Sequence, residues 1–256
     1  MTLSKTHLWI PDPHAHYKYH NKRAEWLGRL INDVKPDTVV CGGDSADMPS
    51  LASYDKGKKS FQGRTYRADI DAHLDFQDRL WAPVRAAKKR LPYRVFLEGN
   101  HEHRITRAIE YQPELEGVIG LADLEIARYY DDFVPYEGGT PGVINLDGIN
   151  FAHYFVSGVM GRAIGGEHPA TSLLTKLHCS SVAFHLHLAD YSIHTNGSGH
   201  KIHGLIAGVY TDYESDWAGR AGKLWWKGAV IARDVDGKGN FNPQFVGIEE
   251  IRKLYG

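Results

Sequence analysis

The stretch FLEGNHEHRI, residues 96–105, joins the end of an apolar strand to a run of chemically active side chains. The apolar residues of 93–97 predict a buried strand, which ends at a glycine. Asn100, His101 and Glu102 follow at once, so the turn presents an amide, an imidazole and a carboxylate in succession. This combination indicates a chemical site at the end of the strand.

The first half of the chain alternates strands and helices around this stretch. The expected strands are 8–10, 38–41 and 93–97, and the expected helices are 21–36, 69–90 and 102–111. Pro83 is expected to interrupt the second helix. Three strands separated by helices favour a mainly parallel sheet with helices packed on it.

The second half is predicted to be richer in strands. Asp147 and Gly148 stand between two apolar runs and suit the tight turn of a hairpin within 142–155. Further strands are expected at 180–188, 201–210, 227–235 and 243–251, with a turn at 236–240. No repeat, low-complexity run or linker divides the chain. We therefore expect one α/β domain, residues 1–256, built of two packed sheets.

Composition and motif searches exclude several classes of protein. The 256 residues include 30 Lys and Arg against 31 Asp and Glu, so a net charge of −1 gives no overall attraction to nucleic acid or membranes. Cys41 and Cys179 do not make a disulfide framework. No apolar signal segment begins the chain, and no apolar run approaches the roughly 20 residues of a membrane span. P-loop, dinucleotide-binding and serine-hydrolase motifs do not occur. We expect a soluble cytoplasmic protein without a membrane partner, and no oligomeric state is predicted.

Metal-binding side chains also follow the first two strands. Asp12 and His14 come after the first strand, and Asp44 and Asp47 come after the second. In an extended chain, residues i and i+2 point to the same face, so Asp12 and His14 are expected to grip one ion together. Because ligands gather beyond the carboxyl ends of parallel strands, these side chains should meet those of the GNHE turn.

The second half supplies histidines in similar positions. His153 follows one expected strand, and His185 and His187 stand two residues apart at the end of another. His200 and His203 are an alternative pair, but they follow a polar loop rather than a strand, so we favour the former pair. One such motif alone is a weak signal, whereas five in order along the chain indicate a metal site.

The motif order D-x-H, G-D-x-x-D, G-N-H-E, a single His and H-x-H, over residues 12–187, resembles that of the calcineurin-like metallophosphoesterases. The compact chain looks like the short phage-encoded members. The resemblance implies a four-layer αββα sandwich of two mixed sheets, with a dinuclear metal site at the carboxyl edge of the strands. It also implies a metal-dependent phosphoester hydrolase, located in the host cytoplasm if it is encoded by a phage.

The resemblance further implies two divalent ions. One ion takes Asp12, His14 and His187, the other takes Asn100, His153 and His185, and Asp44 bridges the two. Oxygen and imidazole ligands without thiolates favour Mn²⁺, with Fe, Zn²⁺ or Ni²⁺ as alternatives. Two ions about 3.5–4 Å apart would activate a water for attack on phosphorus.

Within this arrangement, the side chains of the opening stretch are expected to have different roles. Asn100 would be a neutral oxygen ligand, which keeps the positive charge of the site high. His101 is expected to protonate the leaving oxygen or to stabilise its developing charge. Asp47 is expected to orient and charge His101, with a helix N-cap as its alternative role.

Two residues depart from the family pattern. Phe184 precedes the first H-x-H histidine, where the family usually has glycine, and Met48 replaces an arginine that often follows G-D-x-x-D. Arg104 is the replacement candidate for contacting phosphate, and a solvated helix charge is its alternative role. His16 and His20, near the first motif, are expected to be solvated loop histidines, and lining the pocket is their alternative role.

Residues 54–67 form a local basic segment. Five cations against one acid give 5 − 1 = +4, and three aromatic residues are interleaved: Lys56, Lys58, Lys59, Arg64, Arg67; Asp55; Tyr54, Phe61, Tyr66. This composition is typical of single-stranded nucleic-acid binding, and a solvated loop is the alternative. Trp217, Trp225 and Trp226 are expected in the core or at a sheet edge, and a base-binding platform is their alternative role.

We therefore expect a phosphodiesterase that acts on nucleic acid or nucleotides, with DNA or RNA as candidate partners. A phosphomonoesterase for phosphoproteins or small phosphates is the alternative within the same enzyme class. A non-catalytic, metal-stabilised binding or virion protein is the alternative outside it. The presence of His101 beside a full set of ligands argues against this last reading.

Overall fold

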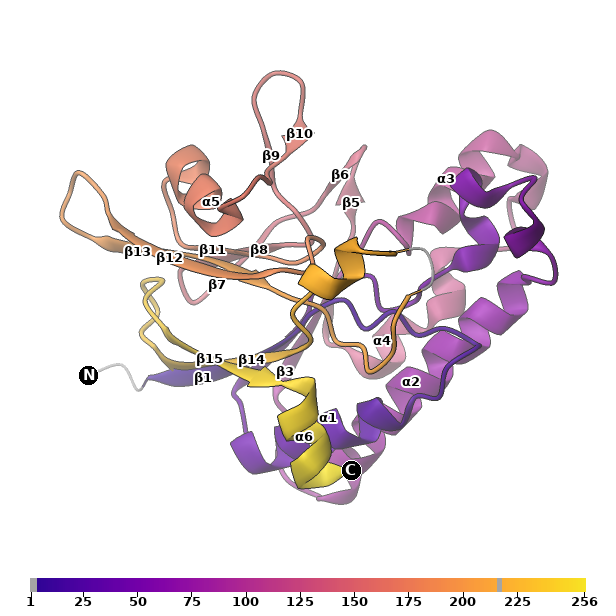
Figure 1. The fold of residues 1–256 in the computed structure, drawn as a ribbon. Helices are drawn as coiled ribbons and strands as arrows, with labels where there is room; N and C mark the ends of the chain where they lie inside the picture. The colour runs from indigo at the N-terminus through magenta and orange to yellow at the C-terminus, as the bar shows by residue number, and fades with distance from the viewer. Residues whose placement is uncertain (1–3, 216–217) are drawn as a thin grey trace.

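Two mixed β-sheets packed face to face organise the protein, whose computed structural model describes residues 4–215 and 218–256 (Figure 1). The six-stranded sheet contains, in spatial order, β15 (Asn242–Gly247), β14 (Gly228–Val235), β1 (Lys5–Ile10), β2 (Thr38–Cys41), β3 (Tyr93–Leu97) and β4 (Asp132–Val134). The five-stranded sheet contains β12 (Ala189–Thr195), β13 (Lys201–Ala207), β11 (Ser181–Ala183), β8 (Ile149–Ala152) and β7 (Ile144–Leu146).

Each sheet has a parallel core and antiparallel outer strands. Strands β1 to β4 run parallel to one another, whereas β14 and β15 are antiparallel additions beside β1. In the second sheet, β8, β11 and β13 are parallel, and β7 and β12 close the two sides. The carboxyl ends of the parallel strands therefore lie along a common edge of each sheet.

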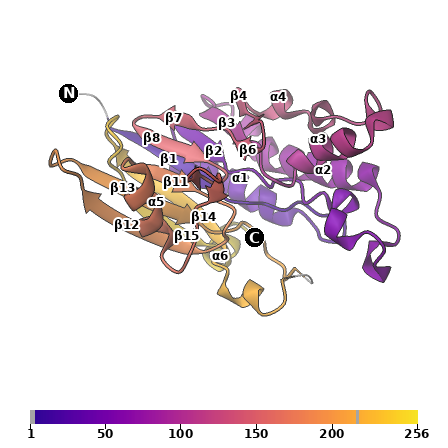
Figure 2. The ribbon, with the colours of Figure 1, turned by 90° about the horizontal axis from the view of Figure 1, so that it is seen from above.

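Three apolar interfaces separate four layers. Helices α1 (Lys22–Val34), α2 (Tyr66–Ala86) and α6 (Ile248–Tyr255) cover the outer face of the six-stranded sheet. Leu8 and Ile10 of β1 point to these helices, and Trp9 between them points to the other sheet, as strand alternation requires. Helix α5 (Pro169–Leu177) covers the outer face of the five-stranded sheet (Figure 2). The four-layer αββα sandwich implied by the family resemblance is confirmed.

Pro83 does not interrupt α2, contrary to expectation. The helix spans Tyr66–Ala86 rather than 69–90, and Pro83 lies in its last turn. The missing N–H of Pro83 removes one i→i−4 bond, and only residues 84–86 follow it within the helix. Gly28 of α1 packs there, because a Cβ on it would lie 2.3 Å from the Leu80 carbonyl oxygen. The two helices therefore approach more closely than larger residues would permit.

The second half follows the expected strands with three corrections. Strand β11 ends at Ala183, so the expected strand at 180–188 is shorter, and β15 ends at Gly247, so 248–251 is helical. Strand β12 and helix α5 have no counterpart in the expectation. The hairpin turn is confirmed: Asp147 and Gly148 both have positive φ, 53° and 83°, as a type I′ turn requires.

Shorter elements surround the carboxyl ends of the strands. They are α3 (His103–Tyr111), α4 (Ile126–Tyr129), the hairpin of β5 (Tyr136–Glu137) with β6 (Thr140–Pro141), and the hairpin of β9 (Val156–Ser157) with β10 (Arg162–Ala163). Short 3₁₀ turns are η1 (Pro49–Leu51), η2 (Ser53–Asp55), η3 (Lys59–Phe61), η4 (Pro113–Leu115), η5 (Leu121–Leu124) and η6 (Ala221–Leu224). In Figure 1 both hairpins project beyond the five-stranded sheet.

Candidate metal centre

Five chain segments that follow strands converge between the two sheets. The side chains they bring together are those after β1 (Asp12, His14), β2 (Asp44, Asp47), β3 (Asn100, His101), β8 (His153) and β11 (His185, His187). All are buried except Asn100 and His185, which are half-buried. Segments far apart in the sequence thus place carboxylates and imidazoles in one protected cluster.

The first group of possible ligands is Asp12, His14 and His187, whose facing atoms all lie within 4.8 Å of one another. Asp12 Oδ2 is 3.0 Å from His187 Nε2, which in turn is 3.2 Å from His14 Nε2. Asp12 is fully buried, and neither of its carboxylate oxygens accepts a hydrogen bond from the described part of the chain. Burial accordingly raises the pKa of Asp12 to about 7. Such a carboxylate needs a cation for compensation.

The second group is Asp44, His153 and His185, again within 4.8 Å. His153 Nε2 is 3.3 Å from Asp44 Oδ2 and 2.9 Å from Asn100 Oδ1. The other Asp44 oxygen, Oδ1, accepts the backbone N–H of His101 at 2.8 Å. Asp44 therefore presents one oxygen to the centre while the second oxygen is fixed by the protein.

Hydrogen bonds to the Nδ1 atoms orient two of the imidazoles. His14 Nδ1 lies 3.1 Å from Asp47 Oδ1, and His153 Nδ1 lies 2.7 Å from the Gly42 carbonyl oxygen. A carboxylate and a carbonyl can only accept, so both Nδ1 atoms carry hydrogen. The Nε2 atoms, which face the centre, are then the atoms that can bind an ion, as in many metal sites.

The electrostatics of the cluster suit divalent cations. Burial disfavours the charged form of Asp44, but the His101 and His153 imidazoles outweigh it and hold the pKa of Asp44 well below its usual range. Burial lowers the pKa of His185 to about 3 and that of His187 to about 4, so both are neutral near pH 7. Burial also opposes protonation of His153, yet the Asp44 carboxylate raises its pKa to about 9. The proton on His153 therefore occupies a position that a metal ion can take. The residues fit a pair of divalent ions.

His101 occupies a third cluster with His14 and Asp47, whose facing atoms also lie within 4.8 Å. Its Nδ1 donates to the Asp47 carbonyl oxygen at 2.7 Å and lies 3.2 Å from Asp47 Oδ1. Its Nε2 is 3.7 Å from Asp44 Oδ2. Burial opposes ionisation of Asp47, but hydrogen bonds from His101 and His14 hold its pKa well below the usual range. Asp47 thus contacts both imidazoles, and it does not cap a helix.

Arg104 lies in the first turn of α3 beside His101. Its guanidinium donates to the carbonyl oxygens of Asp47 at 2.9 Å and Met48 at 3.2 Å. A further nitrogen, Nη2, is 3.0 Å from His101 Nε2 and donates to it. Arg104 is therefore neither a solvated charge nor free for phosphate in this arrangement.

The backbone of the D-x-H and H-x-H motifs is not extended, contrary to expectation. Asp12 and His14 have φ of 32° and 44°, and His185 and His187 have φ of 61° and 60°. These left-handed conformations cost roughly 1–2 kcal/mol per residue. Asp12 and His14 nevertheless share the first group, whereas His187 lies in the first group and His185 in the second, the same division that the family resemblance implies. Strand alternation therefore gives the wrong geometry, because β11 ends at Ala183 before the histidines begin.

Phe184, the departure from the expected glycine, packs on another glycine. Its ring is fully buried, and a Cβ on Gly42 would lie 2.2 Å from it. Gly42 therefore provides the space that Phe184 fills, and its carbonyl still accepts from His153. With Phe184 in place of the expected glycine, the neighbouring His185 still lies in the second group.

Glu102 and Arg23 hold the backbone beneath the cluster, and the sequence motifs gave neither of them a role. The Glu102 carboxylate is fully buried and accepts the N–H groups of Asp44 at 2.9 Å, Ala46 at 2.8 Å and Gly99 at 3.0 Å. Burial, with the nearby Asp44 charge, raises the pKa of Glu102 to about 7. Glu102 therefore ties the loop after β2 to the loop after β3.

Arg23, on α1, is also fully buried. Its guanidinium donates to the carbonyl oxygens of Pro13 at 2.9 Å, His20 at 3.0 Å and Tyr210 at 3.2 Å. It also lies over the ring of Tyr213, whose hydroxyl donates to the His14 carbonyl at 2.5 Å. Arg23 and Tyr213 thus fix the loop that carries Asp12 and His14. Amphipathic spacing on α1 gave no signal for a buried arginine.

Other histidines stand apart from the two groups. His203 on β13 contacts the Tyr191 hydroxyl at 2.7 Å and Asn240 at 3.3 Å, away from the cluster. His20 is exposed, as expected, but His16 is only partly exposed and its Nε2 reaches to 3.8 Å from Asp47 Oδ2. His16 therefore borders the cluster rather than lying free in solvent.

The tryptophans and the basic segment border the same region. The Trp225 ring lies edge-on against His187, with centroids 4.3 Å apart, and Trp226 packs on Phe245 at 5.1 Å. Trp217 lies outside the described residues. In the basic segment, Arg64 donates to the Pro49 carbonyl at 3.0 Å, just beyond Asp47. Arg64, near the end of the segment, therefore lies close to the chain that follows Asp47.

Comparison with known proteins agrees with this geometry. The sequence model of the family described as calcineurin-like phosphoesterase matches residues 6–237. The chain therefore belongs to the calcineurin-like phosphoesterase family, and it is a metal-dependent hydrolase of phosphoester bonds. A search of curated proteins found no match. No helix in 4–215 or 218–256 has both the length and the apolar character that a membrane span needs.

Proposed function

We propose that this hydrolase is a phosphodiesterase that acts on nucleic acid or nucleotides through two divalent ions, with Mn²⁺ as the preferred metal. Asp12, His14 and His187 would hold one ion, Asn100, His153 and His185 would hold the other, and Asp44 would contact both. The observation that carries this proposal is the buried Asp12 carboxylate, which has no hydrogen-bond donor among residues 4–215 and 218–256 and lies 3.0 Å from the His187 imidazole. A cation is the group that stabilises such an arrangement.

The protein side chains have separate tasks around the bound metals. The ions supply an activated water and neutralise charge on the phosphate. Asn100 offers a neutral oxygen, which leaves the site more positive than a carboxylate would. Asp47 holds the Nδ1–H of His101, so the Nε2 atom is the one that can give a proton to the leaving oxygen.

Arg104 couples to the protonation of His101. Its Nη2 donates to the unprotonated Nε2 of His101 in the present arrangement. When His101 gains the proton that it gives to the leaving group, Nε2 no longer accepts from Arg104. The released nitrogen can then contact a phosphate oxygen while the other keeps its bonds to Asp47 and Met48.

Two features favour a diester over a monoester. Arg104 Nη1 is engaged with the carbonyl oxygens of Asp47 and Met48, so only Nη2 can turn to the substrate, which suits the single negative charge of a diester. The basic segment reaches the chain after Asp47 through Arg64 and is mostly exposed, with Lys58 and Arg64 paired to Asp55. Lys56 and Lys59 have no acidic partner in the described ranges, and they can track a nucleic-acid backbone.

The test combines metal content with a substrate panel. Protein purified with Mn²⁺ should bind two ions per chain, and Asp44→Ala should lose both, whereas the exposed control Asp71→Ala should keep them. His101→Ala should reduce kcat/KM on dinucleotides, whose sugar hydroxyl leaves poorly, by about 10²–10⁴-fold. Its loss on bis-p-nitrophenyl phosphate should be clearly smaller, because nitrophenolate leaves without a proton.

Each contrary outcome would refute one particular assignment. Retention of both ions by Asp44→Ala would refute the shared-ligand assignment. Equal losses on both esters, with lost metal, would make His101 a ligand rather than an acid. Faster hydrolysis of monoesters than of diesters would establish the phosphomonoesterase alternative instead. The family membership itself favours either enzyme over a non-catalytic binding protein.

A further inference from the structure

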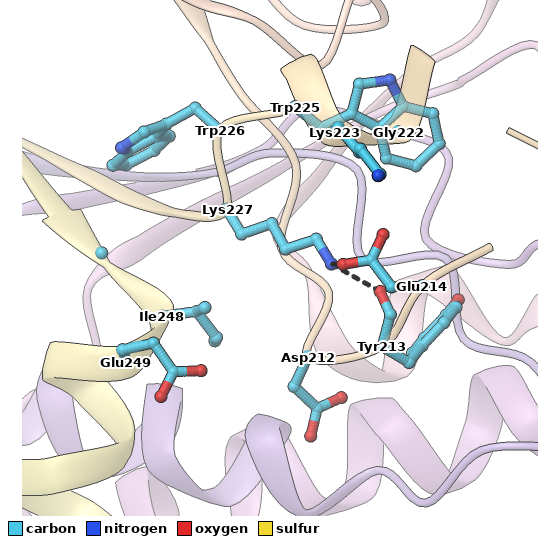
Figure 3. A pocket seen from close by; sticks show the side chains of 11 residues that line it. Asp212, Tyr213, Glu214, Gly222, Lys223, Trp225, Trp226, Lys227, Ile248 and Glu249 are labelled. Carbon is cyan, nitrogen blue, oxygen red and sulfur yellow. Dashed lines mark hydrogen bonds and ion pairs between the residues drawn. The ribbon is translucent and has the colours of Figure 1, made fainter. Parts of the chain in front are cut away.

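A cavity of about 490 Å³ lies beside the metal centre, between residues 212–214 and 222–227 on one side and the start of α6 on the other (Figure 3). Its lining includes Tyr213, Trp225, Trp226 and Ile248 as apolar surfaces. The volume falls within the roughly 300–1,000 Å³ that small-molecule sites occupy. No motif in the sequence pointed to this cavity.

Two residues connect the cavity to the first group of metal ligands. The half-buried Trp225 lines the cavity, and its ring also lies against His187 at 4.3 Å. Tyr213 lines the cavity too, and its hydroxyl donates to the His14 carbonyl. Only the ring of Trp225 lies between the cavity and His187. A substituent on a phosphate bound at the centre can therefore reach the cavity.

The charges of the cavity do not suit a second phosphate. Three acids line it against two lysines: Asp212, Glu214, Glu249; Lys223, Lys227. The Lys227 ammonium is already engaged, because it donates to the Tyr213 carbonyl and to Glu214 at 2.7 Å each (Figure 3). An uncharged group with hydrogen-bond donors is therefore preferred over an anion.

An uncharged ring bearing N–H donors matches both properties of the cavity. Flat aromatic side chains such as Trp225 stack on nucleobases regardless of sequence. Glu214 accepts from Lys227 through Oε1, and Glu249 accepts from Arg252 through Oε2. The other oxygen of each carboxylate, on opposite sides in Figure 3, can receive amino groups from such a ring. We propose that this cavity binds the nucleobase of the nucleoside esterified to the scissile phosphate, with the base against Trp225. This inference rests on the proposed action on nucleotides or nucleic acid.

The test compares two esters that release the same nitrophenolate. They are the p-nitrophenyl ester of adenosine 5′-monophosphate and methyl p-nitrophenyl phosphate, which differ only in the nucleoside. The readout is the ratio of their kcat/KM values, because an indirect effect of Trp225 on His187 cancels in it. Trp225→Ala should lower this preference for the nucleoside ester about tenfold. Trp225→Phe, which keeps a ring, should lower it less, and Tyr111→Ala, an exposed aromatic on α3, should leave it unchanged.

A binding measurement separates this inference from the proposed function. Metal-free protein should bind adenosine 5′-monophosphate more tightly than inorganic phosphate in equilibrium dialysis, and Trp225→Ala should remove the difference. If the wild type hydrolyses neither ester, the proposed function fails, while dialysis still tests the cavity. An unchanged ratio in folded Trp225→Ala and Trp225→Phe would overturn the inference. Equal binding of phosphate and the nucleotide by the wild type would overturn it as well.

Discussion

Loops 12–14 and 44–47 face the same centre, but buried side chains of opposite charge hold them. Arg23 donates to carbonyl oxygens on and around the first loop, whereas Glu102 accepts N–H groups of the second. Both loops contain residues with positive φ, a conformation that persists only where surrounding contacts support it. A single buried charge with several backbone partners provides that support in each case.

The two arrangements differ in how many metal ligands depend on them. The loop held by Arg23 carries Asp12 and His14, which belong to the first group of possible ligands and not to the second. The loop held by Glu102 carries Asp44, the ligand proposed to be shared, and Glu102 also binds the N–H of Gly99 next to Asn100. The comparison teaches that Glu102 should support both ions and Arg23 mainly one.

Glu102→Gln should have the largest effect. A glutamine offers one acceptor oxygen, and its NH₂ group would face N–H donors of Asp44, Ala46 or Gly99, so the loop should shift. Replacing a residue that supports metal ligands typically costs 10–100-fold, and we expect about 10²-fold lower kcat/KM with both ions weakened. Metal analysis and steady-state kinetics measure this. The exposed Glu110→Gln on α3 is the matched control, and normal metal content in Glu102→Gln would break the comparison.

Arg23→Lys should have a smaller and more selective effect. One ammonium cannot reach the carbonyls of Pro13, His20 and Tyr210 together, because it lacks the planar fork of a guanidinium. We expect about tenfold lower kcat/KM and loss of one ion per chain rather than two. Calorimetric titration with Mn²⁺ counts the sites. The exposed Arg29→Lys on the same helix is the control. Loss of both ions would show that Arg23 supports the whole centre.

The prediction with the smallest effect concerns His73. It distinguishes support of the two metal-binding loops from the stability of the whole fold. Burial lowers the pKa of His73, on α2, to about 4, against 6.5 for an unfolded histidine. The unfolded chain therefore binds a proton first as the pH falls, so folding stability decreases from about pH 6.5 down to about pH 4. Between pH 7.5 and 5 this contributes about 2 kcal/mol of lost stability.

Urea unfolding of metal-free protein at several pH values measures this contribution of His73. His73→Phe should flatten the pH dependence without changing the number of ions bound at pH 7.5. If His73→Phe lost one ion or both, as the two loop variants are expected to do, metal loss in those variants would reflect stability rather than loop geometry. An unchanged pH slope would show that His73 is not the titrating group.

The chemistry of the centre could be read from local sequence because strand ends carry it. Asp12, Asp44 and His153 each follow an apolar run, and parallel strands must bring such positions to one edge. The hairpin at Asp147 was equally readable, since few residues tolerate its backbone. These signals lie within a few residues of the feature that they predict.

Other features could not be read in this way. The continuation of α2 through Pro83 depends on its packing against Gly28 of α1. The positive φ values at His185 and His187 contradict the expectation that these residues lie in an extended strand. In each case a contact between distant segments decides the local conformation, and a window of neighbouring residues does not contain it.

The sequence by itself thus determined which side chains gather at the centre and the family to which their order belongs. Only the tertiary structure decided how they are held: Arg23 reaches carbonyls from Pro13 to Tyr210, and Asp47 touches two imidazoles at once. It also decided that Trp225 lies against His187 and borders a cavity. The physical reason is that ligand identity is a property of single residues. Backbone support, proton positions and cavities arise from close contacts between segments far apart in the chain, and these leave no periodic pattern in it.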